Sequence, residues 1–244
     1  MKLKTLFVLS FTLLIVFLIY LSHIDKKVYY VALGDYQALG VTNEGIITYG
    51  YSDYLKDRLK TNNKLETYLI GYAKDNARIT DVINDIEQNR ELKIKSRKQT
   101  LKNALIKADL ITLSIGMNDL FYKIGVNHNL EQLNYNELYY HVDEMMEDME
   151  KLFKLLREYC KEDIIITNFY NPTNQTYTKL EDVLTYANNR LEELSNYYDI
   201  EYIKVDDIFK TRKTSFENIY PTNNEYKKIS KRIETKMNQI LLNK

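Results

Sequence analysis

The sequence has few of the residues that build disulfide frameworks or metal centres. Its 244 residues include one cysteine, Cys160, so neither an intrachain disulfide nor a cysteine-based zinc site can form. Cys160 ends a helical pattern, and we expect it to be a buried, inert thiol. The three histidines, His23, His128 and His141, fall in unrelated contexts without metal-ligand spacing. We therefore predict no metal site and no cofactor.

Net charge and tryptophan are also lacking. Lys plus Arg and Asp plus Glu are both 34, so the formal charge is zero, which argues against a nucleic-acid partner. Tyrosine is abundant, with 22 residues, and we attribute this to an AT-rich coding sequence rather than to a special aromatic surface. With 45% hydrophobic residues the chain can form a packed core, and its length suits one domain or at most two.

Residues 1–27 have the pattern of a membrane anchor. Lys2 and Lys4 precede an uncharged apolar run over 6–21, close to the roughly 17 residues that a spanning helix needs. No A-x-A-like cleavage site follows, which favours an uncleaved signal anchor over a cleaved signal peptide. No cysteine follows the run either, which excludes a bacterial lipoprotein.

The positive amino end should stay in the cytoplasm. We therefore predict a single-pass protein of the cell membrane with residues 28–244 outside the cytoplasm, or a secreted protein if the segment is cleaved. Oligomeric state is not indicated by the sequence.

Strand-like and helix-like patterns alternate after the anchor, which is typical of a doubly wound α/β fold with a parallel sheet. The predicted strands are 28–33, 65–72, 108–115, 163–169 and 201–205, and the predicted helices are 51–60, 80–89, 138–161, 180–198 and 224–242. We interpret the basic stretch 90–100 as a solvated helix face and 120–137 as loop-like or partly helical. The prediction is one three-layer α/β/α, flavodoxin-like domain with a central five-stranded sheet.

Three polar motifs follow predicted strands or precede the last helix. They are Gly34-Asp35-Tyr36, Gly116-Met117-Asn118-Asp119 and Glu217-Asn218-Ile219-Tyr220-Pro221. Because functional sites of open α/β sheets lie at the carboxyl ends of the strands, we expect the three motifs to converge there.

Together the motifs resemble the SGNH, or GDSL, hydrolase family of esterases and lipases. That family has G-D-S, G-x-N-D and D-x-x-H-P at these places, and the resemblance runs from Val28 to the carboxyl terminus. Tyr226, six residues after Tyr220, and the turn Tyr170-Asn171-Pro172 also look like the family. The resemblance implies acyl transfer by a Ser-His-Asp triad with an oxyanion hole.

Carried over position by position, the resemblance assigns Asn118 as the oxyanion asparagine. It assigns Asp35, Gly116 and Asp119 as supporting residues, and places the second oxyanion residue, a glycine in the family, at Asn76 rather than at Gly71.

The pattern departs from the family at the triad itself. Tyr36 stands at the Ser position, Tyr220 at the His position and Glu217 at the Asp position. A phenol with a pKa near 10 is a poor nucleophile without a base, and triad members act as a unit. We therefore predict a divergent, catalytically inactive pseudo-esterase that binds a small molecule, glycan or lipid of the cell envelope, with Tyr36 and Tyr220 lining the old pocket.

Other functions remain open. The chain could be an active esterase or acylhydrolase, on esters or acetylated glycans, with rearranged residues. Ser114 is expected to be buried, and His128 or His141 would then have to reach the site.

A carboxylate site of Asp35, Asp119 and Glu217 is another enzymatic alternative. A structural or scaffold protein that uses the basic segment 90–102 or the long helix for contact is the third class.

Overall fold

The computed structural model describes residues 27–94, 97–124, 133–172, 178–210 and 219–242. The predicted anchor, apart from Lys27, lies outside the described residues, so its helix and its membrane insertion stay predictions. Within the described ranges, no helix is long and apolar enough to cross a membrane.

A five-stranded parallel sheet forms the centre of the domain, as predicted. Its order is β2-β1-β5-β6-β7. The strands are β1 (Val28–Gly34), β2 (Leu65–Leu69), β5 (Leu110–Ser114), β6 (Asp163–Thr167) and β7 (Glu201–Ile203). Every residue of β1 and β5 is buried, because helices cover both faces of the sheet.

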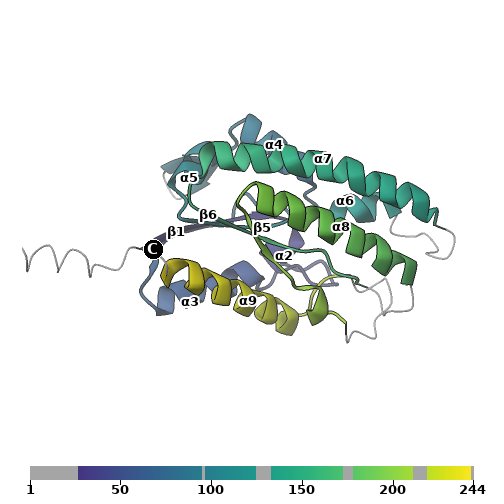
Figure 1. The fold of residues 1–244 in the computed structure, drawn as a ribbon. Coiled ribbons are helices and arrows are strands. Elements are labelled where there is room, and N and C mark those ends of the chain that lie inside the picture. Colours follow the sequence, from purple (N-terminus) through teal and green to yellow (C-terminus); the bar gives the residue numbers. More distant parts are fainter. Residues whose placement is uncertain (1–26, 95–96, 125–132, 173–177, 211–218, 243–244) are drawn as a thin grey trace, which may run out of the picture.

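Helices form the two outer layers (Figure 1). One layer contains α3 (Tyr51–Thr61) and α9 (Asn223–Leu242), and the other contains α4 (Ile79–Glu87), α5 (Leu101–Lys107), α6 (Met117–Ile124), α7 (Tyr135–Tyr159) and α8 (Thr178–Tyr197). The four-residue α2 (Tyr36–Leu39) and the 3-10 turn η2 (Asp206–Ile208) are short connecting elements. This is the predicted three-layer α/β/α arrangement.

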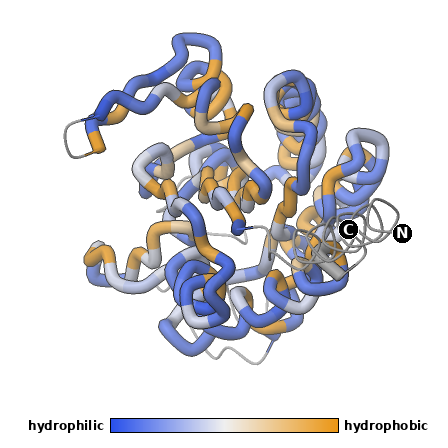
Figure 2. Tube along the Cα trace, turned by 90° about the vertical axis from the view of Figure 1, so that its left-hand side faces the viewer, coloured by the Kyte–Doolittle hydropathy of each residue, from blue (hydrophilic) through white to orange (hydrophobic). Residues whose placement is uncertain are grey.

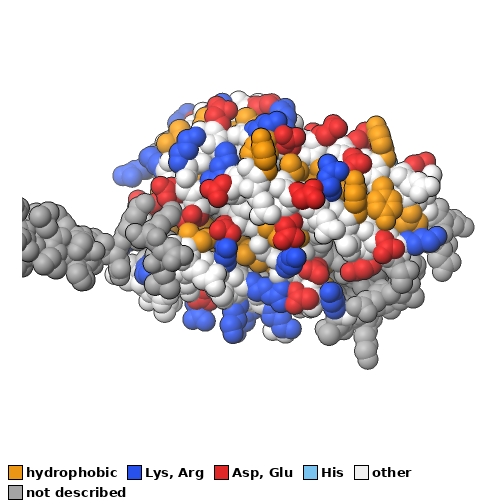
Figure 3. Space-filling view, in the orientation of Figure 1, with side chains coloured by type: hydrophobic (Ala, Val, Ile, Leu, Met, Phe, Trp, Pro, Cys, Tyr) orange, Lys and Arg blue, Asp and Glu red, His pale blue; other side chains and the backbone are white. Residues whose placement is uncertain are grey.

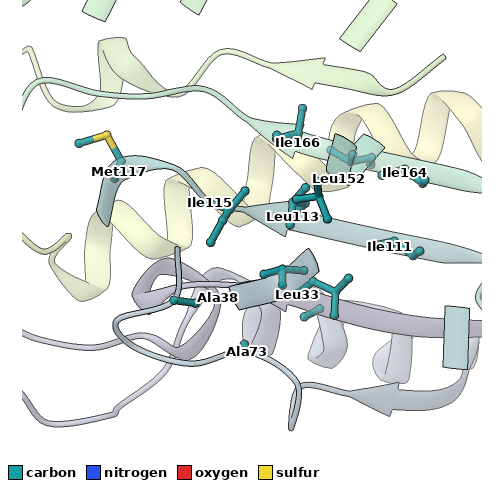
Figure 4. Close-up of a cluster of buried hydrophobic side chains, with 14 of the residues drawn as sticks. Leu33, Ala38, Ala73, Ile111, Leu113, Ile115, Met117, Leu152, Ile164 and Ile166 are labelled. Atoms are coloured by element: carbon teal, nitrogen blue, oxygen red, sulfur yellow. The ribbon is translucent and has the colours of Figure 1, made fainter. Parts of the chain in front are cut away.

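The core lies on both faces of the sheet. Figure 2 shows apolar strand segments at the centre of the molecule with more hydrophilic helices around them. Figure 4 shows the packing in detail, where Leu33, Leu113 and Ile166 of adjacent strands lie in one cluster with Leu152 of α7. Cys160 is buried with its Sγ 3.9 Å from the Ala108 carbonyl oxygen, and burial raises the pKa of its thiol, as expected of an inert residue.

The basic stretch 90–100 is not a helix, so that prediction was wrong. It forms an antiparallel hairpin of β3 (Glu91–Ile94) and β4 (Arg97–Thr100). Leu92 packs against Gly71, and the Tyr72 hydroxyl donates to the Gln99 carbonyl at 2.7 Å. Leu92 and Ile94 follow the two-residue period of a strand, but the surrounding charged residues obscured this pattern in the sequence.

Two predicted loops are helix starts. Tyr36 opens α2, and Met117, Asn118 and Asp119 form the first turn of α6. The long helix begins at Tyr135 instead of Leu138. The strand predicted over 65–72 ends at Leu69, because the chain turns there toward the site.

Candidate functional site

The site begins where β1 and β5 approach each other closely at their carboxyl ends. Gly34 has φ +114°, and a Cβ there would lie 1.8 Å from the Ser114 carbonyl oxygen. The same oxygen accepts a hydrogen bond from the Asp35 N–H at 2.9 Å. Only glycine fits this backbone. The close contact between Gly34 and Ser114 fixes the direction in which the next residues leave the sheet.

Asp35 is fully buried and begins α2. Its Oδ1 accepts the Gln37 N–H at 3.1 Å, an N-cap contact that satisfies one amide of the short helix. Its Oδ2 has no hydrogen-bond partner among the described residues. Burial is the main reason that the pKa of this carboxyl rises from 3.8 to about 8, so Asp35 carries its proton at neutral pH.

Tyr36 is fully buried, and its hydroxyl is part of a hydrogen-bond chain. The hydroxyl lies 3.0 Å from the Tyr170 hydroxyl, which in turn donates to the Ile219 carbonyl at 2.8 Å. Because Tyr170 uses its proton on Ile219, Tyr36 is the donor in the first bond. Burial, then the neighbouring Tyr170, raises the pKa of Tyr36 well above 10. The side chain is a neutral phenol inside the core.

Tyr220 is half-buried beside it. The rings of Tyr36 and Tyr220 are perpendicular with centroids 4.8 Å apart, a favourable edge-to-face geometry. The Tyr220 N–H donates to Asn43 Oδ1 at 3.1 Å, which holds this segment against the loop between α2 and α3. Burial raises the pKa of Tyr220, so it is neutral as well.

Tyr226 and Tyr170 complete what we call the tyrosine cluster: Tyr36, Tyr170, Tyr220 and Tyr226. The buried Tyr226 hydroxyl donates to the carbonyl oxygens of Val41 at 2.8 Å and Tyr36 at 3.3 Å. The Tyr170 ring stacks on Phe209 with centroids 3.8 Å apart. The cluster therefore joins the end of β1, the loop after β6 and the start of α9.

Asn118 lies at the predicted place, but both of its amide hydrogens are used. Its Nδ2 donates to the carbonyl oxygens of Asp75 at 3.0 Å and Ala77 at 2.9 Å. These carbonyls flank the exposed Asn76, so the structure does bring Asn118 and Asn76 together. In this arrangement the Asn118 amide holds the loop and has no hydrogen left for an oxyanion.

Asp119 and Gly116 support the same region. Asp119 Oδ2 accepts the Ile79 N–H at 3.2 Å and so caps α4, while burial raises the pKa of this carboxyl to about 7. Gly116 has φ +104°, and a Cβ there would lie 2.7 Å from the Phe169 ring. Both residues position the first turn of α6.

The remaining predicted residues are not part of the tyrosine cluster. Glu217 and His128 lie outside the described residues. His141 bonds Glu144 Oε2 through Nδ1 at 3.0 Å and lines a separate cavity of about 370 Å³ with Asp119 and Tyr122. Ser114 is fully buried, as expected.

The sequence predicts that Tyr36 and Tyr220 line the old pocket. In the structure the two rings are in contact, and Tyr36 has no exposed surface. Tyr170 and Tyr226 were noted only as family-like residues, with no contact assigned to them. Their positions, after a strand and one turn into the last helix, were the available signal for a link to Tyr36.

Solved structures share this fold. A lipase from a goat rumen metagenome has 18% sequence identity and a TM-score of 0.69, and the match covers 84% of this chain and 95% of that one. An acetylxylan esterase from Geobacillus stearothermophilus has 14% identity and a TM-score of 0.61, over 88% and 95% of the chains. A catalytic mutant of that esterase, with a serine replaced by alanine, gives 13% identity and a TM-score of 0.63 over the same shares.

No curated protein matches the sequence. A family model does match it, over residues 33–224, which is most of the chain and includes the carboxyl end of β1, Asn118 and Tyr220. Because this match spans most of the chain, the chain belongs to the GDSL-like lipase/acylhydrolase family.

Proposed function

We propose that this protein is a catalytically inactive member of the family, held at the outer face of a cell membrane by residues 1–27, which binds a ligand of the cell envelope. The observation that carries the proposal is the burial of Tyr36 with its hydroxyl bonded to Tyr170. Acyl transfer needs an accessible nucleophile, a base and an oxyanion hole. Tyr36 offers a buried neutral phenol at the first of these positions.

The positions of the base and of the oxyanion hole also support an inactive protein. Tyr220 holds the position of the base, and a neutral phenol whose pKa is raised does not take up a proton near neutral pH. The amide hydrogens of Asn118 are used on the Asp75 and Ala77 carbonyls. Each element of the reaction is thus replaced by a contact that stabilises the fold.

The half-exposed ring of Tyr220 is the member of the cluster that a ligand can touch. An aromatic face of this kind stacks on a sugar ring or an acyl chain. The similar lipase and acetylxylan esterase make acyl and glycan groups the first ligands to test. Titration of the full chain with acetylated xylan fragments should give binding that Tyr220→Ala weakens and Tyr122→Ala does not.

An active esterase is the second candidate, and the two carboxyls with raised pKa values favour it. Asp35 and Asp119 titrate at about 8 and 7, near the range where general acids and bases act. Their hydrogen bonds to the Gln37 and Ile79 amides match capping roles, which is why we rank this candidate second.

The deciding experiment is hydrolysis of short-chain p-nitrophenyl esters by the full chain in detergent. We expect the unmodified protein and Tyr36→Phe to give only the background rate. A Tyr36→Ser, Tyr220→His double variant tests whether the old pocket reopens, and gained activity would support the proposal. Turnover by the unmodified protein that Tyr36→Phe abolishes would overturn it, and turnover lost only in Asp35→Asn or Asp119→Asn would favour the carboxylate site.

A further inference from the structure

A second hollow lies between α3 and α9, and its lining on α9 begins at Asn224, three residues after the third motif. These helices pack side by side in one outer layer (Figure 1). Their surface encloses a groove of about 520 Å³, within the range of small-ligand sites. It is lined by Tyr54, Asp57, Arg58 and Thr61 from α3 and by Asn224, Lys227, Lys228, Ser230, Lys231 and Glu234 from α9.

The groove carries a local positive charge in a chain whose formal net charge is zero. Its two acids are already paired: Glu234 Oε2 lies 3.5 Å from Arg58 Nε, and Asp57 contacts the Tyr49 hydroxyl and Lys56. The three lysines that line the groove are exposed. Over the described ranges, no carboxylate lies within ion-pair distance of Lys227, Lys228 or Lys231. Figure 3 shows Lys and Arg side chains gathered along the lower edge of the molecule, over α9.

The arrangement of these lysines costs stability when the groove is empty. Lys227 and Lys231 are four residues apart, and like charges at this spacing repel on one helix face. Two neighbouring cations of α9 do form ion pairs within the chain: Arg232 pairs with Asp207, and Lys236 pairs with Glu201. An anion in the groove would remove the repulsion that the chain itself leaves unbalanced.

We propose that this groove binds a ligand carrying two or more phosphate groups. A lysine ammonium is a compact point charge that suits phosphate. Lys227 and Lys231 are separated by about 6 Å along the helix axis, which suits two linked phosphates better than one. Tyr54, Thr61 and Asn224 add hydroxyl and amide donors. The proposal is independent of the tyrosine cluster and of any hydrolysis.

Isothermal titration of the full chain in neutral detergent tests the groove, with sodium tripolyphosphate as probe and orthophosphate as comparison. We expect tripolyphosphate to bind more tightly. The variant Lys227→Gln, Lys228→Gln, Lys231→Gln should weaken binding by roughly tenfold, because three ion pairs are lost. The matched control changes three exposed lysines elsewhere, Lys93, Lys107 and Lys161, and should leave the affinity near that of the unmodified protein.

A variant that is expected to increase the affinity distinguishes a lost binding site from a folding defect. Glu234→Gln leaves Arg58 uncompensated in the groove and should tighten binding. Anionic phospholipid added to the micelles distinguishes the sources of the phosphate: competition with tripolyphosphate identifies a lipid headgroup, and its absence a soluble phosphate compound. Equal binding by the groove variant and the unmodified protein, or equal loss in both triple variants, would overturn the proposal.

Discussion

At the residue scale, Tyr36 places a large phenol ring in the core directly after β1. The ring has no exposed surface, and its hydroxyl is a donor to Tyr170. The adjacent Asp35 carboxyl is fully buried as well and has little access to water. Its raised pKa follows from this loss of hydration.

The Asp35 carboxyl makes stability depend on pH. The unfolded chain releases this proton near pH 3.8, whereas the folded chain holds it up to about pH 8. The folded state therefore binds more protons between these values, and its stability falls as pH rises. Asp35→Asn keeps an N-cap residue and removes the titration.

We expect Asp35→Asn to gain stability over the unmodified protein as pH rises from about 5 to 8, by on the order of 1 kcal/mol or more. Urea denaturation across this range is the measurement. Asp182→Asn on α8, at an exposed side chain, is the control for the effect of an Asp-to-Asn substitution on stability. A constant difference for Asp35→Asn would mean that its carboxyl is ionised in the fold.

At the scale of elements, the site depends on how closely the parallel neighbours β1 and β5 approach each other at their carboxyl ends. Gly34 pairs with Ser114 in the register of the two strands, and this pairing sets the start of α2. The sequence indicated a break at Gly34, but the reason for glycine is the backbone of a strand 80 residues away in the chain.

Gly34→Ala should be strongly destabilising, by about 4 kcal/mol or more, because its Cβ would overlap the Ser114 carbonyl. Gly45→Ala is the matched control. Gly45 also has a positive φ, of 71°, but a Cβ there meets nothing within 4 Å, so only the backbone cost of about 1 kcal/mol applies. Thermal unfolding compares the stability of the two variants. Similar losses of stability would show that backbone strain, and not the overlap with the Ser114 carbonyl, causes the destabilisation of Gly34→Ala.

The strands and long helices were predictable because burial on both faces leaves mainly apolar runs in β1 and β5, and because α7 repeats its apolar residues at helical spacing. The meeting of the motifs at one sheet edge followed from the parallel order. The hairpin β3–β4 was not predictable, since Leu92 and Ile94 alone carry its period. Nor was the full burial of Tyr36, because the hydrogen bonds that link it to Tyr170 and Tyr226 join residues that are 134 and 190 positions apart.

At the scale of the whole molecule, the anchor that we propose in residues 1–27 predicts that the domain is held at a membrane. We expect the full chain to sediment with membranes and to remain there after an alkaline carbonate wash. A chain that starts at Lys27 should appear in the supernatant with the same circular dichroism in its folded domain. Recovery of the full chain in the supernatant would contradict the anchor and leave the secreted form.

The tyrosine cluster also gives the protein an intrinsic optical reporter. The chain has no tryptophan, so its near-ultraviolet circular dichroism arises from tyrosine and phenylalanine. Rings held in fixed, asymmetric packing dominate such a spectrum, and the perpendicular pair of Tyr36 and Tyr220 is held in this way. A change at the site, whether by ligand or by substitution, is therefore visible in a spectrum that no tryptophan obscures.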